Sequence, residues 1–469
     1  MENPRMPTLP WDWKRIFLIL AILLIPLNGF PGPAALRELS VEASVYPISI
    51  YILLNINGIV SVITKKFLIF ILVAMVIALN YLINYDTISQ HIKGNISGAD
   101  KFITSLFVFS FYFSFSVAVY SHLRAKSHAY VGRIIRIVAI ILSPALICVW
   151  SIETVSWYIP SLRNLIEPIR RTVSIGPYFS IGRIYGVSYE PSFNAIVMVG
   201  LLPFLAYLYF DQDRPRVARI RTFAVMFVFF IFCALSDSRT AYLALLSQLA
   251  IILLFGTSSN GPRRSTVIIL TLCFVVFPVI VLHAIAVDLD SIDIASQSVS
   301  NITRLSSIHA ALMIWHDNLW FGSGFGQFGF LYPAYIPSVG VASWEVMDYL
   351  YNSRWHHFAP SYSLFGRILA ETGVSGYLIF SLLVVLVVRM LPPSIAESGA
   401  RSFFPLTLFC VLGICGSLTV GLSFDSYRQA FLWLFLGVTA AAGGIRSCSS
   451  TPCKSNPIEE KVPGRNSYV

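Results

Sequence analysis

Residues 67–84 read FLIFILVAMVIALNYLIN, a stretch without a single charged side chain. A helix rises about 1.5 Å per residue, so a run of this length comes close to crossing the roughly 30 Å hydrocarbon core of a bilayer. Similar apolar runs recur along the chain, and we expect an all-α, polytopic transmembrane protein with about 12 spans. The candidate spans lie at about 16–30, 43–63, 67–84, 102–120, 134–151, 193–210, 222–236, 240–256, 265–285, 373–391, 402–420 and 426–443.

Composition supports a membrane protein and argues against soluble classes. Of the 469 residues, 56% are hydrophobic and only 12% are charged, whereas a soluble domain carries about 25% charged residues. The net charge of +10 is better explained by basic cytoplasmic loops than by nucleic-acid binding. We therefore expect one transmembrane domain over residues 1–445 and a polar, disordered cytoplasmic tail over 446–469.

The short basic connections fall on one side of the predicted topology. With the N-terminus in the cytoplasm, alternation places Lys65-Lys66 and the basic connections at 121–133, 211–221 and 257–264 inside. This agrees with the excess of Lys and Arg in cytoplasmic loops of membrane proteins. The outer side then receives two long loops, at about 152–192 and about 286–361, and we expect amphipathic helices at the interface in the second.

The first outer loop ends in a polar segment that precedes a span. Arg183 and Glu190 lie in it, and Glu190 is followed by Pro191 and Ser192. One interpretation is structural, because proline suits the first turn of a helix and the Glu and Ser side chains can serve its free N–H groups. The other interpretation is that Arg183 and Glu190 face a polar cavity at the membrane surface.

Further arginines and histidines lie close to apolar segments on the same side. Arg239 follows Asp237 between two apolar runs with almost no loop, and ionisable groups at such depth usually mark a site or neutralise each other. The stretch from Ile302 to Trp315 has helical apolar spacing, and Arg304 stands near its start. His357 belongs to a histidine pair that would suit acid–base chemistry or serve only as interfacial side chains.

Two other patterns bear on cofactors. Gly322, Gly324 and Gly326 form a GxGxG pattern, but it lacks a preceding strand and lies on the outer side, so a tight turn is favoured over a dinucleotide site. The acidic residues of segment 288–293 have loose spacing for a metal. We therefore expect neither a cofactor nor a metal ion.

Four segments together resemble the O-antigen ligase/polymerase superfamily. They read GRIYGVSYEPSFNA at 182–195, SDSRTAYLALL at 236–246, GSGFGQFGFLYP at 322–333 and LAETGVSGYL at 369–378. Their order, spacing and common outer location carry the resemblance, which covers about residues 165–385. It implies a fold related to the GT-C-type membrane glycosyltransferases that use lipid-linked sugars.

The resemblance also implies a chemistry and a location. The donor would be an oligosaccharide on undecaprenyl diphosphate at the periplasmic face of a bacterial inner membrane, in contact with membrane lipid. A metal-independent transfer would join glycan units, with a chain-length regulator as a candidate partner and no nucleic acid. Arg183, Arg239 and Arg304 would bind the diphosphate, and His357 or Glu190 would act on the acceptor hydroxyl.

One departure from the family pattern concerns the acceptor-side residue. Relatives place a histidine before a small polar residue, about nine residues before the glutamate that corresponds to Glu371, and this chain has Tyr362-Ser363 there. Either His357 reaches the site or Tyr362 has replaced the histidine, although tyrosine is a poor base at neutral pH.

The favoured function is an O-antigen polymerase. An O-antigen ligase acting on lipid A–core and an exopolysaccharide polymerase are alternatives within the same family. A transporter or flippase for lipid-linked glycans is the rival from another class. It fits less well because the sequence has no related halves and its polar residues gather on one face.

Overall fold

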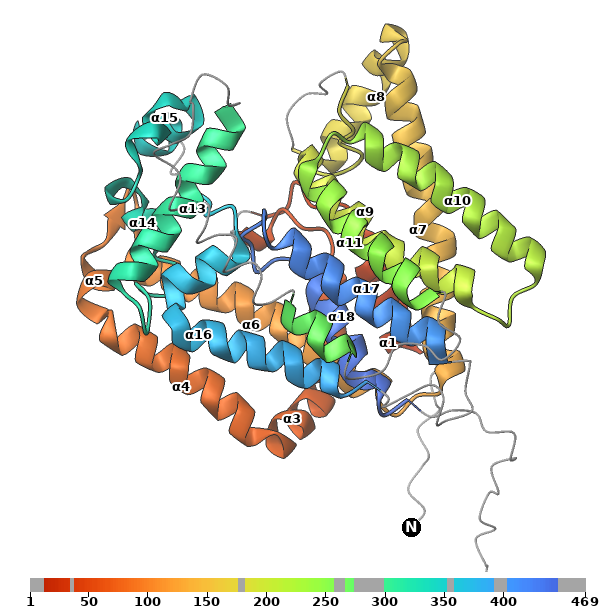
Figure 1. The fold of residues 1–469 in the computed structure, drawn as a ribbon, viewed down its shortest axis with the longest axis horizontal. Helices are drawn as coiled ribbons and strands as arrows, with labels where there is room; N and C mark the ends of the chain where they lie inside the picture. Colours follow the sequence, from red (N-terminus) through yellow and green to blue (C-terminus); the bar gives the residue numbers. More distant parts are fainter. Residues whose placement is uncertain are drawn as a thin grey trace, which may run out of the picture.

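The structure is a computed structural model, and it describes residues 12–33, 38–175, 182–256, 266–273, 299–351, 358–391 and 403–445. Within these ranges the chain is helical except for short connections and one small hairpin (Figure 1). The expected C-terminal tail lies outside the described residues, as does His357.

The first part of the chain forms eight helices and the hairpin. They are α1 (Trp13–Leu24), α2 (Val45–Leu54), α3 (Ile56–Lys65), α4 (Phe67–Ile83), α5 (Tyr85–Gln90), β1 (Ile92–Lys93), β2 (Ile96–Ser97), α6 (Gly98–Leu123), α7 (His128–Ser156) and α8 (Pro160–Val173). Strands β1 and β2 pair antiparallel. A reciprocal capping box between Ser97 and Asp100 starts α6 directly after the hairpin.

The second part supplies the central helices and a group of short ones. They are α9 (Pro191–Phe210), α10 (Arg216–Leu235), α11 (Arg239–Gly256), α13 (Val299–Asp317), α14 (Phe328–Leu331), η4 (Tyr332–Ala334), η5 (Ser338–Ala342), α15 (Trp344–Tyr351), α16 (Leu364–Arg389), α17 (Phe404–Val420) and α18 (Ala430–Ala442).

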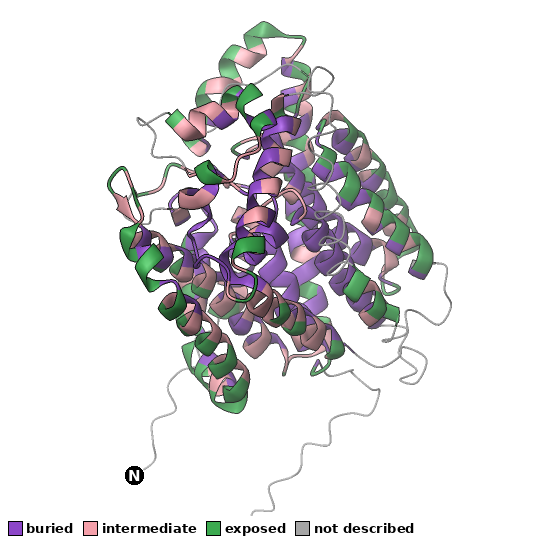
Figure 2. Ribbon diagram, turned by 60° about the vertical axis from the view of Figure 1, so that its left-hand side comes forward, coloured by how far each residue is buried: buried purple, intermediate pink, exposed green. Residues whose placement is uncertain are grey.

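Helices α9, α17 and α18 form the core, with α6 and α11 packed against them. Most residues of α9 and nearly every residue of α17 and α18 are buried. Figure 2 shows the buried residues gathered in the interior of the molecule. Small residues allow the close approach, since a Cβ on Gly200 would lie 2.3 Å from the Phe431 ring. Gln248 of α11 crosslinks the core by donating to the carbonyls of Val199 and Leu412, each at 3.0 Å.

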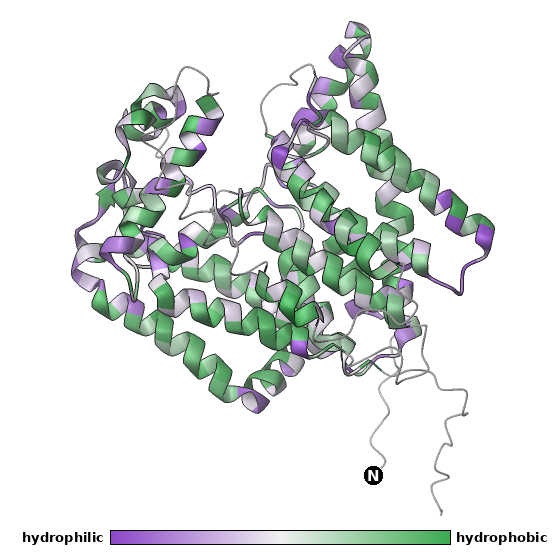
Figure 3. Cartoon of the chain, viewed as in Figure 1, coloured by the Kyte–Doolittle hydropathy of each residue, from purple (hydrophilic) through white to green (hydrophobic). Residues whose placement is uncertain are grey.

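The outer helices expose apolar side chains on the surface of the protein. On α10 a lengthwise stripe of large hydrophobic residues is exposed, namely Val217, Ile220, Phe223, Phe227 and Ile231. In Figure 3 the ribbons of α4 and α10 are green, that is hydrophobic, over most of their length. A soluble protein would not leave such stripes in water, so they identify helices that face lipid. The protein is therefore a polytopic membrane protein.

The described helices that are long enough to cross a membrane are fewer than the spans that hydropathy predicts. Among the described residues, five helices are long and apolar enough to cross a membrane, or up to six with the bent pair α2–α3, and shorter apolar helices accompany them. The expected span at 43–63 is two helices meeting at 68° around Asn55, whose amide bonds to the Tyr51 carbonyl. The expected span at 265–285 lies largely outside the described residues, and the count of about 12 stays a prediction.

The expected amphipathic stretch from Ile302 to Trp315 is a helix, but it does not lie flat at the surface. It belongs to α13, which packs against α16, α15 and η5 and is buried over most of its circumference. In Figure 1, α13, α15 and α8 stand at the same end of the molecule, opposite the α3–α4 corner that carries Lys65 and Lys66.

Candidate functional site

The glycine-rich segment after α13 is locked to a break in α16. Gly373 interrupts α16 with φ +65° and ψ −164°, a conformation open to glycine and strained for other residues. Gly322, with φ +65°, lies so close that a Cβ there would be 2.4 Å from the backbone carbon of Glu371. Ser323 N–H donates to the Ala370 carbonyl at 2.8 Å, and Val374 N–H donates to the Leu319 carbonyl at 2.9 Å. The motif segments 322–333 and 369–378 thus pack together, and we call the two the glycine-rich unit.

The break in α16 directs two charged side chains toward a cavity. Arg367 Nε lies 3.0 Å from Glu371 Oε1, and both side chains are largely withdrawn from solvent. The Arg367 guanidinium also donates to the Asp425 backbone carbonyl at 3.3 Å and lies over the Tyr427 ring. A buried ion pair of this kind needs such additional partners to offset the loss of hydration.

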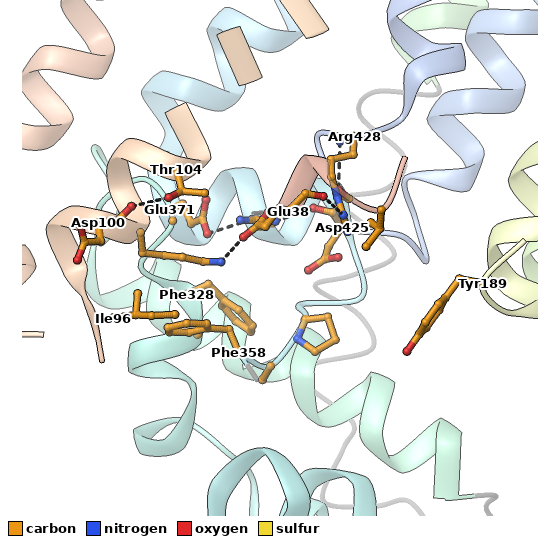
Figure 4. A pocket seen from close by; sticks show the side chains of 18 of the residues that line it. Glu38, Ile96, Asp100, Thr104, Tyr189, Phe328, Phe358, Glu371, Asp425 and Arg428 are labelled. Carbon is orange, nitrogen blue, oxygen red and sulfur yellow. Dashed lines mark hydrogen bonds and ion pairs between the residues drawn. The ribbon is translucent and has the colours of Figure 1, made fainter. Parts of the chain in front are cut away.

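The cavity has a volume of about 760 Å³ and collects residues from distant parts of the chain (Figure 4). Its charged lining pairs residues from different elements. Lys101 in the first turn of α6 forms an ion pair with Glu38, and Arg428 donates to the Glu38 carbonyl at 2.7 Å. Burial raises the pKa of Glu38, but Lys101 and Arg428 outweigh it and lower the pKa to about 2. Glu38 is therefore ionised in the folded protein.

Aromatic side chains form the rest of the wall. Phe358 lies beneath the Lys101 ammonium, 4.7 Å from ring centroid to nitrogen, and Phe328 stands beside it. Figure 4 shows Tyr189 on the opposite side of the cavity from these two rings. Charged pairs and flat apolar surfaces thus face one another across the space.

The three arginines singled out in the sequence are connected by two side-chain contacts and by short steps along the sequence, and we call them the arginine chain. The Arg183 guanidinium donates to the Asp237 carbonyl at 3.3 Å, and its Nε lies 3.8 Å from the Asp237 carboxylate. Arg239, two residues after Asp237, donates to the Asn301 side chain at the start of α13. Arg304 follows Asn301 by three residues and hence lies on the same face of that helix. Asp237 therefore pairs with Arg183 rather than with Arg239.

Arg304 lies over Tyr362, one of the two candidates that the sequence left open for the acceptor side. The guanidinium carbon is 5.6 Å from the ring centroid, and Arg304 Nε is buried with no hydrogen-bond partner among the described residues. Tyr362 has φ +51°, which is uncommon for a non-glycine residue, and its hydroxyl lies 3.2 Å from that of Tyr349. Burial, followed by the effect of Tyr349, raises the pKa of Tyr362 well above its usual value, so this phenol stays protonated.

Glu190 lies near the same tyrosines. It occupies the N-cap position of α9 with Pro191 as first residue, but its side chain makes no capping bond. The carboxylate instead accepts from the Ser192 hydroxyl, and it is half-buried. The structural interpretation of the Glu-Pro-Ser segment is therefore correct for Pro191 and wrong for a Glu190 cap. The Glu190 charge is one of the influences that raise the pKa of Tyr362.

The described residues leave two expectations open. His357 lies outside them, directly before Phe358 of the cavity wall. No three His, Cys, Asp or Glu side chains in the described ranges gather in a way that would hold a metal ion, and segment 288–293 lies outside these ranges. Metal independence stays a prediction.

Sequence reasoning missed the charged residues of the cavity. The main ones are Glu38, Lys101, Arg367, Asp425 and Arg428. A usable signal was present, because each lies in or beside an apolar segment, where ionisable groups are costly. The cavity and the arginine chain are neighbours, since Ser361 N–H donates to the Asp425 carboxylate at 2.7 Å and the next residue, Tyr362, contacts Arg304.

Comparison with known proteins agrees with the geometry. The O-antigen ligase family matches residues 224–381, a range that contains Arg239, Arg304 and both halves of the glycine-rich unit. No curated protein matches the chain. Enzymes of this family transfer glycans, and the family implies a lipid-linked glycan as the substrate. The match covers about a third of the chain, and together with the motifs and the membrane helices it supports membership in the O-antigen ligase/polymerase superfamily.

Proposed function

We propose that the protein polymerises oligosaccharide repeat units carried on undecaprenyl diphosphate, at the periplasmic face of a bacterial inner membrane. The observation that carries this proposal is the arginine chain of Arg183, Arg239 and Arg304 beside a polar cavity. A protein that only spans the membrane would have no need for three arginines at one end, next to a cavity with a charged interior.

The arginines are suited to the diphosphate leaving group. Breaking the bond between a sugar and a phosphate oxygen builds negative charge on the diphosphate, and fixed cations aimed at that charge stabilise the transition state. Arginine stays charged and donates two parallel hydrogen bonds to phosphate oxygens. Arg183 and Arg239 are exposed and Arg304 is half-buried, so all three guanidinium groups can contact a ligand.

The acceptor hydroxyl requires a base on the other side of the reacting carbon. Its oxygen forms the new bond to the anomeric carbon, its proton passes to the base, and the electron pair of the broken bond leaves with the lipid diphosphate. Glu190 and His357 are the candidate bases. Glu190 is a half-buried carboxylate that follows Tyr189 of the cavity wall in the sequence. His357 lies outside the described residues and comes directly before Phe358 in the sequence. A single displacement would invert the anomeric configuration.

The finer assignment within the family rests on sequence. The Glu-Pro-Ser segment before α9 favours a polymerase over a ligase that acts on lipid A–core, and an exopolysaccharide polymerase fits the same residues. A transporter would place its polar site near the middle of the membrane between related halves. Helices α8, α13 and α15 stand at one end of the molecule instead (Figure 1), and Arg304 lies on α13, which supports an enzyme.

The placement in the membrane is part of the same proposal. The basic connections face the cytoplasm, about 12 spans form a single domain over residues 1–445, and the tail at 446–469 stays inside. A chain-length regulator would then meet the periplasmic end, where α8 and α15 stand. Transfer would proceed without a metal ion.

The test is a lipopolysaccharide gel of a strain lacking the gene, complemented with wild type, Arg239→Ala or Arg171→Ala. Arg171 lies on α8 in an ion pair with Glu167 and is the matched control. A polymerase predicts core plus a single repeat unit in the deletion strain and in Arg239→Ala, with the long ladder restored by wild type and Arg171→Ala. Bare core with polymer accumulating on the carrier lipid would identify a ligase. A normal ladder in the deletion strain would contradict O-antigen assembly.

A further inference from the structure

The cavity differs in charge from the arginine chain beside it. Its charged lining is acidic at four positions and basic at three: Glu38, Asp100, Glu371 and Asp425, against Lys101, Arg367 and Arg428. Two ion pairs, Lys101 with Glu38 and Arg367 with Glu371, neutralise four of these charges. The remaining three are two acids and one base, so the space offers no net attraction for an anion. In the proposed function the arginines bind the diphosphate, and the cavity suits an uncharged polar ligand.

The lining combines two kinds of surface that a sugar requires. Carboxylates accept hydrogen bonds from hydroxyl groups, and Asp425 and Glu371 face the space. The rings of Tyr189, Phe328 and Phe358 offer flat apolar surfaces to the C–H faces of a pyranose. The volume of about 760 Å³ falls within the range of about 300–1,000 Å³ that is usual for small-molecule sites.

One short loop separates the cavity from the arginines. On one side, Ser361 N–H donates to Asp425, and on the other, the Tyr362 ring lies beneath Arg304. A second contact also joins the arginine side to the cavity side: the Thr240 hydroxyl lies 2.6 Å from the Ser423 hydroxyl. Thr240 follows Arg239, and Ser423 precedes Asp425 by two residues. Asp425 is therefore the cavity carboxylate that lies at the boundary with the arginines.

We propose that this cavity binds the terminal sugars of the acceptor glycan and that Asp425 accepts a hydrogen bond from one of their hydroxyl groups. The inference rests on the proposed glycan transfer and adds a location for the acceptor. In an in-line displacement the attacking hydroxyl and the departing diphosphate lie on opposite faces of the anomeric carbon. A sugar site and a cationic site on two sides of one loop meet that requirement.

The binding test uses the full chain in lipid nanodiscs and two probes. The first is the repeat-unit oligosaccharide released from the host's own surface polysaccharide by mild acid, observed by saturation-transfer NMR. The second is undecaprenyl diphosphate, observed by native mass spectrometry. Tyr189→Ala and Asp425→Asn should weaken oligosaccharide binding at least tenfold and leave undecaprenyl diphosphate binding unchanged. Arg239→Ala should do the reverse, and Tyr158→Ala, at a tyrosine that is 81% exposed outside the cavity, should change neither.

The outcomes separate this inference from the proposed function. Oligosaccharide binding that is absent from wild type, unchanged in both cavity variants, or weakened equally by Arg239→Ala would overturn the acceptor site. Undecaprenyl diphosphate binding and a polysaccharide ladder that survive Arg239→Ala would instead overturn the proposed function. Tyr189 is 38% exposed, so its truncation keeps the test valid even if Asp425→Asn impairs folding through the lost Ser361 contact.

A kinetic measurement distinguishes the acceptor from the donor. Transfer from the lipid-linked donor onto a fluorescent repeat-unit oligosaccharide gives a separate KM for each substrate. Tyr189→Ala and Asp425→Asn should raise the KM of the soluble acceptor about tenfold and leave the KM of the donor unchanged. A rise confined to the donor KM would assign the cavity to the donor glycan and contradict the inference.

Discussion

The side-chain amide of Asn80 donates to the backbone carbonyl of Glu371 at 2.9 Å, although 291 positions separate the two residues. Its carbonyl oxygen accepts from Phe325 N–H at 2.9 Å, and its amide also donates to the Phe321 carbonyl. One buried side chain of α4 therefore satisfies backbone groups on both halves of the glycine-rich unit. A break in a membrane helix leaves such groups without partners, and in lipid each would be costly.

Asn80→Ala should destabilise the protein by about 1–3 kcal/mol, because the backbone groups at Phe325 and Glu371 stay buried and lose their partner. Thermal unfolding in detergent would measure the change. Asn84→Ala is the matched control, since Asn84 lies one turn later in the chain and donates only to the Asn80 carbonyl in the described contacts. Equal unfolding temperatures for Asn80→Ala and Asn84→Ala would contradict the role of Asn80.

Gly373→Ala should abolish the folded protein. Alanine disfavours φ +65°, and its Cβ would lie 2.5 Å from the Trp320 backbone carbon, which cannot move without breaking the paired segment. The measure is the yield of monodisperse protein after detergent extraction. Gly366→Ala, in the same helix, meets nothing closer than 3.5 Å and should give the wild-type yield. A normal yield of Gly373→Ala would show that the break in α16 can straighten.

Hydropathy predicted best the helices that consist of one nearly continuous apolar run. The expected span at 67–84 is α4, and that at 193–210 is α9, because in each an unbroken apolar run decides both length and position. The expected span at 373–391 covers only the part of α16 that follows the break at Gly373. Helix α16 starts at Leu364, and the polar residues that hydropathy rejected, Arg367 and Glu371, pair with each other inside the protein.

In the candidate site too, the residues marked by a local sequence pattern could be predicted and those brought together by helix packing could not. Arg183, Arg239 and Arg304 could be selected from the sequence because arginine at the edge of an apolar run is costly and rare. The cavity could not be predicted, because its lining joins Glu38, Lys101 and Asp425 from three segments that are far apart in the sequence. No local pattern specifies that Lys101 will meet Glu38. Such pairing depends on how the helices pack, which hydropathy does not determine.

Tyr362→Phe should retain most of the activity, within about tenfold of wild type. Burial keeps the pKa of the phenol far above neutral, so this hydroxyl cannot take a proton from an acceptor. Tyr362→Ala should lose considerably more, because the ring beneath Arg304 is removed. The measure is the rate of glycan transfer in nanodiscs. A Tyr362→Phe variant as inactive as Tyr362→Ala would assign the hydroxyl a direct part in the reaction.

Glu38 should make stability depend on pH in an acidic window. Lys101 and Arg428 hold its pKa at about 2 in the folded protein, against an ordinary value of 4.5. Because the folded pKa is the lower one, the stabilising contribution is fully present above pH 4.5 and is lost as the pH falls toward 2. The side chain is 32% exposed, so screening reduces the size of the effect but not its sign.

The measurement compares wild type with Glu38→Gln by thermal unfolding at pH 7 and pH 3. Wild type should unfold at the higher temperature at pH 7, and its advantage over Glu38→Gln should shrink at pH 3, where protonation of Glu38 begins to cost the folded state its ion pair with Lys101. Glu167→Gln is the control, because its partner Arg171 is 60% exposed and surface pairs of this kind contribute little. An advantage of wild type over Glu38→Gln that is the same at both pH values would mean that Lys101 and Arg428 do not stabilise the Glu38 carboxylate in the folded protein.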